Sequence, residues 1–149
     1  MKIEITSHYG FTDILSSAPA SWDLILICSP GGVNPPEEFT SIARRTLHLF
    51  FDDHDNPSPG VVLPTIEDIK EAVEWSLSSE KLLVACYMGR SRSAALAYII
   101  QCREVVPEYA LQILLPRWHR PNRLIVRIGA EILENPNVLH AFDEWQTKL

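Results

Sequence analysis

The sequence predicts an α/β protein with a central, mostly parallel sheet of four or five strands flanked by helices. Short β-rich runs alternate with segments of helical periodicity, and most of these runs are apolar throughout, as in strands buried on both faces. Clusters of Pro and Gly mark the loops between them. A strand, helix, strand order builds parallel sheets, and residues 1–149 are expected to form one domain.

Strands are expected at four places. In chain order they are Lys2–Thr6, Asp23–Cys28, Thr46–Phe51 and Lys81–Ala85. The last three are mostly apolar, which favours the inside of a sheet. Two stretches rich in Pro and Gly, Ser29–Pro36 (SPGGVNPP) and Asn56–Pro64 (NPSPGVVLP), are predicted to be loops within the domain.

The best helix signal spans Thr65–Ser78. Thr65 can cap this helix with Asp68 three positions later, and apolar residues recur on one stripe. Ser93–Arg103 is apolar on nearly all sides, which predicts a helix buried in the middle of the domain. The remaining helices are expected at Glu37–Arg44, Pro107–Leu115, Pro121–Leu133 and Val138–Thr147.

The composition limits the partners of the chain. Its formal net charge is −6 and its pI is near 5.3, so broad charge-driven binding to nucleic acid or to anionic lipid is not expected. No apolar run approaches the roughly 20 residues that span a bilayer, and no basic and apolar leader begins the sequence. We therefore expect a cytoplasmic monomer without a membrane span.

The cysteines indicate neither a disulfide framework nor a metal site. There are three of them, Cys28, Cys86 and Cys102, so one stays unpaired in any scheme, and their spacing fits no zinc pattern. An odd number of cysteines without a disulfide framework fits a reducing compartment, where thiols stay unpaired. Cys28 and Cys102 are expected to fill the core, which leaves Cys86 free to react.

The most specific feature is CYMGRSRS, Cys86–Ser93, between a predicted strand and a predicted helix. Backbone N–H groups at the start of a helix lack internal partners and can converge on one anion, and the helix dipole adds to the attraction. Gly89 supplies the backbone freedom of a closed loop, and Arg92 offers a planar fork for two oxygens of a phosphate. The predicted phosphate-binding residues are Tyr87, Met88, Gly89, Arg90, Ser91 and Arg92.

Cys86 is predicted to be the nucleophile of this loop. A helix N-terminus and neighbouring cations favour the thiolate over the thiol. A cysteine and an arginine at this spacing can also be a buried structural residue and a solvated surface charge. The catalytic interpretation is favoured by the strand that precedes the loop, by Gly89 three residues after Cys86 and by Ser93 directly after Arg92.

The loop resembles that of the Cys-dependent protein tyrosine phosphatases, and most closely of their compact dual-specificity branch, which reads His-Cys-x-x-Gly-x-x-Arg-Ser. Four positions match it: Cys86, Gly89, Arg92 and Ser93. The segments MGRSRSAALAYII and RPNRLIVRIGAEIL extend the resemblance over roughly Asp23–Leu133, and the chain looks most like small bacterial tyrosine phosphatases. Ala85 departs from the pattern, because the family usually has His there, a residue that helps to set the hydrogen bonding of the loop.

The resemblance implies a phosphatase that forms a phosphocysteine at Cys86, with Arg92 holding the phosphate. Ser93 would hydrogen-bond the departing thiolate, and it also suits the N-cap of the following helix. The substrate is expected to be a phosphomonoester, first of all phosphotyrosine on a protein, with phosphoserine and phosphothreonine as alternatives. No metal and no organic cofactor is implied.

The resemblance also implies a general acid, an Asp on a loop before the cysteine strand. The run LFFDDHD offers Asp52, Asp53 and Asp55. Alignment with the family's Asp-His junction selects Asp53, and we rank the three in the order Asp53, Asp55, Asp52. An acid that precedes the cysteine favours the dual-specificity chain order over that of the low-molecular-weight phosphatases.

Two other functions stay open. Ala85 and the uncertain acid allow a pseudophosphatase that binds phosphate without turnover. Non-protein phosphates, such as phosphoinositides or nucleotides, are a further substrate class. Arg90 and the basic cluster Arg117–Arg127 either select or steer a charged substrate or form a solvated surface.

Overall fold

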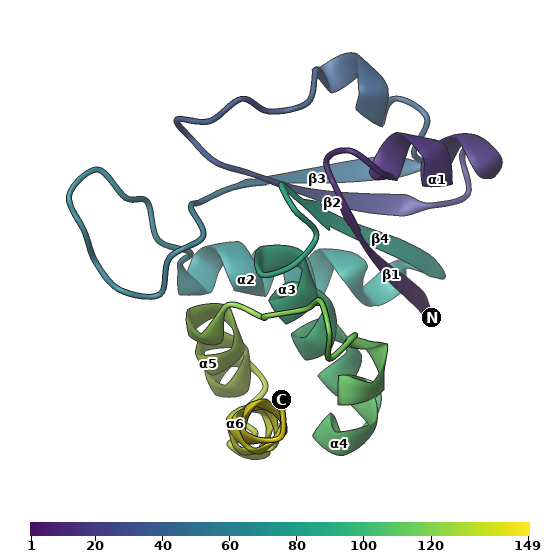
Figure 1. The fold of residues 1–149 in the computed structure, drawn as a ribbon. Coiled ribbons are helices and arrows are strands. Elements are labelled where there is room, and N and C mark those ends of the chain that lie inside the picture. The colour runs from purple at the N-terminus through teal and green to yellow at the C-terminus, as the bar shows by residue number, and fades with distance from the viewer.

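The computed structural model describes residues 1–149 and has a four-stranded sheet with helices on both faces (Figure 1). The strands are β1 (Lys2–Ser7), β2 (Asp23–Cys28), β3 (Arg45–Phe50) and β4 (Lys81–Cys86). Their spatial order is β1-β4-β2-β3, and every pair is parallel. The predicted α/β class and the parallel sheet are confirmed, with four strands.

Six α-helices and three short 3-10 helices complete the chain. The α-helices are α1 (Phe11–Ser17), α2 (Ile66–Trp75), α3 (Arg92–Cys102), α4 (Pro107–Ala110), α5 (Arg123–Ile132) and α6 (Asn137–Thr147). The 3-10 helices are η1 (Glu37–Thr40), η2 (Ser76–Ser78) and η3 (Leu111–Ile113). None of the helices has both the length and the apolar composition to cross a bilayer.

Local hydrogen bonds explain where the helices differ from the expected ranges. The segment expected to be helical at 37–44 forms only η1, because the hydroxyls of Thr40 and Ser41 bond the carbonyls three residues earlier. The segment 107–115 divides into α4 and η3. Asn122 delays the start of α5, because its side chain caps the helix by accepting from the Ile125 N–H at 3.1 Å.

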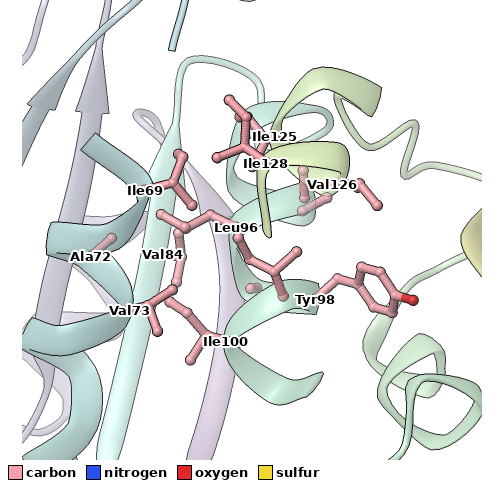
Figure 2. Packing of buried hydrophobic residues seen from close by; sticks show 14 of the residues in the cluster. Ile69, Ala72, Val73, Val84, Leu96, Tyr98, Ile100, Ile125, Val126 and Ile128 are labelled. Carbon is pink, nitrogen blue, oxygen red and sulfur yellow. The ribbon is translucent and has the colours of Figure 1, made fainter. Parts of the chain in front are cut away.

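The main core lies between the sheet and helices α2, α3 and α5 (Figure 2). Every residue of α3 from Arg92 to Ile100 is buried, which confirms the expected central helix. Leu96 and Ile100 of α3 face Val84 of β4, as Figure 2 shows. Burial of side chains of this size contributes about 1.5 to 3 kcal/mol each. The candidate catalytic loop, residues 86–93, therefore begins at the end of the buried strand β4 and ends in the first turn of the buried helix α3.

A smaller core on the opposite face contains Phe11 and Leu15 of α1. They pack on the side chains of β2 and β4 that point away from the main core, including Leu24 and Ala85. The sequence analysis does not predict α1, a helix of seven residues, FTDILSS, with only these two residues buried. Each face of the sheet is thus covered.

Asp23 links strands and loops at the amino end of the sheet. Its side chain is 1% exposed. Arg44 donates two hydrogen bonds of 2.7 Å to it, Arg45 Nε donates one of 3.0 Å, and Ser79 Oγ donates one of 2.6 Å. Burial by itself raises the pKa of Asp23, but these hydrogen bonds and the guanidinium charges outweigh it and hold the pKa below its ordinary value.

Candidate active site

The candidate site lies at the carboxyl edge of the sheet, where parallel strands bring their ends together. Cys86 ends β4 and is 2% exposed. Ser29 follows β2, and Phe51 follows β3. Residues far apart in the sequence therefore meet around one thiol.

Gly89 closes the loop between β4 and α3 against the end of β1. It has a φ of +65°, a backbone conformation that residues with a Cβ atom rarely adopt. A Cβ atom at this position would lie 2.7 Å from the Thr6 carbonyl carbon and 2.8 Å from the Ser7 nitrogen. Both the backbone conformation and the close approach of β1 therefore require glycine.

Arg92 is fixed on one side of its guanidinium and unpaired on another. It is 5% exposed, and its Nη1 donates to Ser29 Oγ at 2.9 Å and to the Phe51 carbonyl at 2.8 Å. Its Nε is buried and has no hydrogen-bond partner. Buried N–H groups are nearly always paired, so this orphan donor indicates a place for an acceptor from outside the protein.

The Cys86 thiol has a hydroxyl as its neighbour. The Sγ of Cys86 lies 3.0 Å from the Oγ of Ser93, which is fully buried in the first turn of α3. The N-cap of α3 is Ser91, one residue before the helix begins, so the expected second role of Ser93 as a cap is wrong. Its hydroxyl is directed to the thiol instead.

Only one of the three candidate acids lines the cavity above the thiol. Asp53 Oδ1 accepts from Ser91 Oγ at 2.7 Å and from Asn122 Nδ2 at 3.0 Å. Asp52 instead accepts from the Val62 N–H and braces its own loop. Asp55 accepts only from its neighbour in the chain, Asn56.

The cavity itself is strongly basic. It has a volume of about 410 Å³ and is lined by Asp53, Cys86, Tyr87, Met88, Arg90, Ser91, Arg92 and Arg120. Arg90 Nε donates to the Trp118 carbonyl at 2.9 Å, and its guanidinium lies over the Trp118 ring at 5.3 Å. Arg120 donates to the carbonyls of Pro116 and His119. None of the three arginines forms an ion pair with a carboxylate of the chain, and Asp53 is the one acidic residue of the lining.

His8 lies beside the loop, although the family's histidine position is taken by Ala85. Its backbone N–H donates to the Tyr87 carbonyl at 3.2 Å, and its ring meets the Tyr87 ring edge-on at 6.0 Å. Its Nε2 lies 2.8 Å from the Ile27 carbonyl. Burial lowers the pKa of His8, and the charge of Arg92 lowers it further.

Burial disfavours the thiolate at the other two cysteines. Burial raises the pKa of Cys28, and it raises the pKa of Cys102 to about 12. All three cysteines are free thiols. Ionised thiols at neutral pH are therefore not expected at Cys28 or Cys102.

Sequence reasoning missed three residues that shape this site: His8, Ser29 and Asn122. Asn122 holds Asp53, and Ser29 holds Arg92. They come from three different loops, and of the three only Asn122 lies in a segment, RPNRLIVRIGAEIL, that the sequence analysis singled out. The order of the strands, which places the ends of β1 and β2 on either side of β4, would have been needed to find His8 and Ser29.

Comparisons with known proteins define the class of fold. No protein-family model and no curated protein sequence matches the chain. Human DUSP28 is similar with a TM-score of 0.61 and 18% identity, over 89% of this chain and 91% of that chain. PTPMT1 in complex with PI(5)P gives 0.60 and 14%, over 93% and 90%, and Tk-PTP in the active form gives 0.58 and 15%, over 90% and 92%.

The chain thus has the compact fold of the Cys-dependent tyrosine and dual-specificity phosphatases. The resemblance that the loop sequence indicated is confirmed at the level of the fold.

Proposed function

We propose that this protein is a Cys-dependent phosphatase that hydrolyses phosphomonoesters through a phosphocysteine at Cys86, with phosphotyrosine in proteins as its main substrate. The observation that carries the proposal is Arg92, a buried and tethered residue that has an unpaired Nε and lines the same cavity as the Cys86 thiol. A tetrahedral oxyanion is the partner that suits such a fork. No carboxylate of the chain takes that place.

In the first step, the Cys86 thiolate forms an S–P bond as the bond from phosphorus to the leaving oxygen breaks. Asp53 donates a proton to that oxygen. Ser91 and Asn122 both hold Oδ1 of Asp53, which leaves Oδ2 to carry the proton. Arg92 and the N–H groups of the loop stabilise the equatorial oxygens.

In the second step, a water molecule attacks the phosphorus and the S–P bond breaks. Asp53, now ionised, accepts a proton from this water. The electron pair of the broken bond returns to Cys86, where the hydroxyl of Ser93, 3.0 Å away, can donate to the thiolate. Inorganic phosphate is then released.

An aromatic rim supports phosphotyrosine as the substrate. Tyr87 lines the cavity, is 45% exposed and accepts a 2.8 Å hydrogen bond from the hydroxyl of Tyr9, which is 69% exposed. Met88 lines the cavity beside it. Exposed aromatic and thioether side chains around a phosphate site suit a substrate that carries an aromatic ring.

A phosphoinositide is the second candidate substrate. The observation that favours it is the charge of the cavity, since Arg90 and Arg120 are available beside Arg92 for further phosphate groups. One structure with a similar fold, PTPMT1, is in complex with PI(5)P. Release of phosphate from inositol lipids, compared with release from phosphotyrosyl peptides, separates the two substrate classes.

The proposed enzyme acts as a monomer in the cytoplasm. A reducing compartment keeps its three cysteines as thiols. The proposed reaction uses no metal and no organic cofactor, so EDTA is expected to leave turnover unchanged.

Turnover of para-nitrophenyl phosphate by the wild type and by Cys86→Ser tests the proposal. The variant is expected to lose turnover and to keep its affinity for phosphate, measured by calorimetry, because Arg92 and the loop N–H groups are still in place. Vanadate is expected to inhibit the wild type. Phosphate binding without any turnover by the wild type would make this protein a pseudophosphatase, and equal rates for both proteins would remove Cys86 from the mechanism.

A further inference from the structure

A groove of about 570 Å³ runs along β1 and ends at the candidate catalytic loop. Residues 3–7 of β1 form one side, and Met88 and Gly89 form the end. Ile113, Leu115 and Trp118 belong to the facing wall. Leu115 is 58% exposed and Trp118 is 41% exposed, so this wall presents apolar surface to the solvent.

The backbone of β1 is open toward this groove. β1 lies at one edge of the sheet and pairs only with β4 (Figure 1). The Lys2 N–H donates to the Glu80 carbonyl at 2.8 Å, so the even-numbered residues of β1 bond toward β4. In a parallel ladder the alternate residues point the other way, and the N–H and C=O groups of Ile3 and Ile5 therefore face outward without a partner in the chain.

We infer that this groove binds the peptide segment next to the phosphorylated residue of a protein substrate, as an additional strand on β1. An extended main chain is the ligand whose donors and acceptors repeat at the spacing of Ile3 and Ile5. The apolar wall then receives side chains of that segment. The inference rests on the proposed phosphatase function and names its substrate class as extended phosphopeptides.

The groove is continuous with the candidate active site. Met88 lines both the groove and the cavity above Cys86. Ser7 is the partner of Cys86 in the register of β1 and β4, and Ile5 lies two residues before it, roughly 7 Å away. A peptide whose phosphate is at Cys86 therefore pairs with Ile5 and Ile3 through residues about two to five positions from the phosphorylated one.

Amide hydrogen exchange of the Cys86→Ser protein provides the direct test. The probe is a peptide with about five residues on either side of a phosphotyrosine, and phenyl phosphate is the control ligand. The peptide is expected to slow exchange at the amides of Ile3 and Ile5 about tenfold or more, whereas phenyl phosphate is expected to affect only the loop. Unchanged exchange at Ile3 and Ile5 with saturating peptide would overturn the inference.

N-methylation of the peptide backbone provides a second test. In a β ladder only every other residue of the added strand bonds to β1. Methylation is therefore expected to lower kcat/KM about fivefold at alternate positions on one flank of the phosphotyrosine and to have little effect at the positions between them. Loss that is equal at all positions, or at none, contradicts strand addition.

Leu115→Ser tests the wall of the groove, with Leu77→Ser as the matched control. Leu77 is 64% exposed and lies in η2, outside the groove. The ratio of kcat/KM for the phosphopeptide to kcat/KM for phenyl phosphate is expected to fall about tenfold in Leu115→Ser and to stay constant in Leu77→Ser. A constant ratio in both variants argues against the groove.

These experiments separate this inference from the proposed function. Suppose that the wild type shows no hydrolysis of any substrate, and that the bound peptide still protects the amides of Ile3 and Ile5. The docking groove is then supported and the phosphatase function is not. If the wild type hydrolyses the peptide while Ile3 and Ile5 are unaffected, the enzyme stands and the groove does not. Protection that grows with protein concentration in the absence of peptide would assign the edge to a second copy of the chain and overturn the inference.

Discussion

The carboxylate of Asp53 accepts a 2.7 Å hydrogen bond from the hydroxyl of Ser91, so the loop after β3 is joined directly to the loop that carries Cys86. Asn122, just before α5, donates a second hydrogen bond of 3.0 Å to the same oxygen and a third of 3.1 Å to the His54 carbonyl. Two other segments therefore hold this carboxylate in the cavity that Cys86 also lines.

Asp53→Asn is expected to lower kcat for phenyl phosphate about 100-fold, because this poor leaving group needs a proton. The loss is expected to be smaller for para-nitrophenyl phosphate, whose leaving group is less basic. Asp55→Asn is the matched control, since Asp55 lies on the same loop and does not line the cavity. If Asp55→Asn gives the larger loss for phenyl phosphate, the assignment of the acid is wrong.

Arg92→Lys is expected to lower kcat about 100-fold or more and to weaken vanadate binding. Lysine is a point charge that cannot bond Ser29 and Phe51 and still offer two donors to a phosphate. Arg127→Lys makes the same change at an exposed residue of α5 and is expected to be neutral. Near wild-type rates for Arg92→Lys would show that the planar fork is not used.

Gly89→Ala is expected to reduce both stability and vanadate affinity, because the new Cβ would lie within 2.8 Å of the backbone of β1. Gly60→Ala separates the two causes. Gly60 also has a positive φ, +77°, but nothing lies within 4 Å of a Cβ there. Thermal unfolding should show a loss of about 1 kcal/mol for Gly60→Ala and a larger one for Gly89→Ala. Intact vanadate affinity in Gly89→Ala would contradict the packing argument.

Asp23 is expected to make stability fall in acid. The pKa of Asp23 is held below its ordinary value in the folded protein, so its contribution is fully present above the unfolded pKa of about 3.9 and is lost as the pH falls through the lower folded pKa. Urea unfolding across this range measures the effect. Asp23→Asn is expected to cost about 3 kcal/mol at neutral pH and to flatten the acid dependence.

Local sequence patterns were sufficient for much of the fold. The apolar runs at β2 and β4 predict buried strands, and Thr65 with Asp68 predicts the start of α2, where both hydrogen bonds of the capping box are present. The residues Cys86–Ser93 predict the turn, and the apolar run after them predicts the buried helix α3. These features depend on residues that are neighbours in the chain.

The rest depends on contacts between distant segments. Nothing close to Ser29 or Asn122 in the sequence indicates that they bond Arg92 and Asp53, 63 and 69 positions away. Likewise His8 reaches the loop only because β1 pairs with β4. Alignment with the family placed Asp53 above Asp55 as the candidate acid. In the structure, Asp53 accepts a hydrogen bond from Ser91, whereas Asp55 accepts one from its chain neighbour Asn56.

The contact between Gly89 and the Thr6–Ser7 backbone makes the nucleophile dependent on an edge strand. Edge strands open more readily than the centre of a sheet, because one side of their backbone has no ladder to hold it. Partial fraying of β1 would free Gly89 and let the anion receptor lose its shape while α3 and its core persist. Mild denaturation should therefore abolish turnover before far-ultraviolet circular dichroism detects any loss of secondary structure.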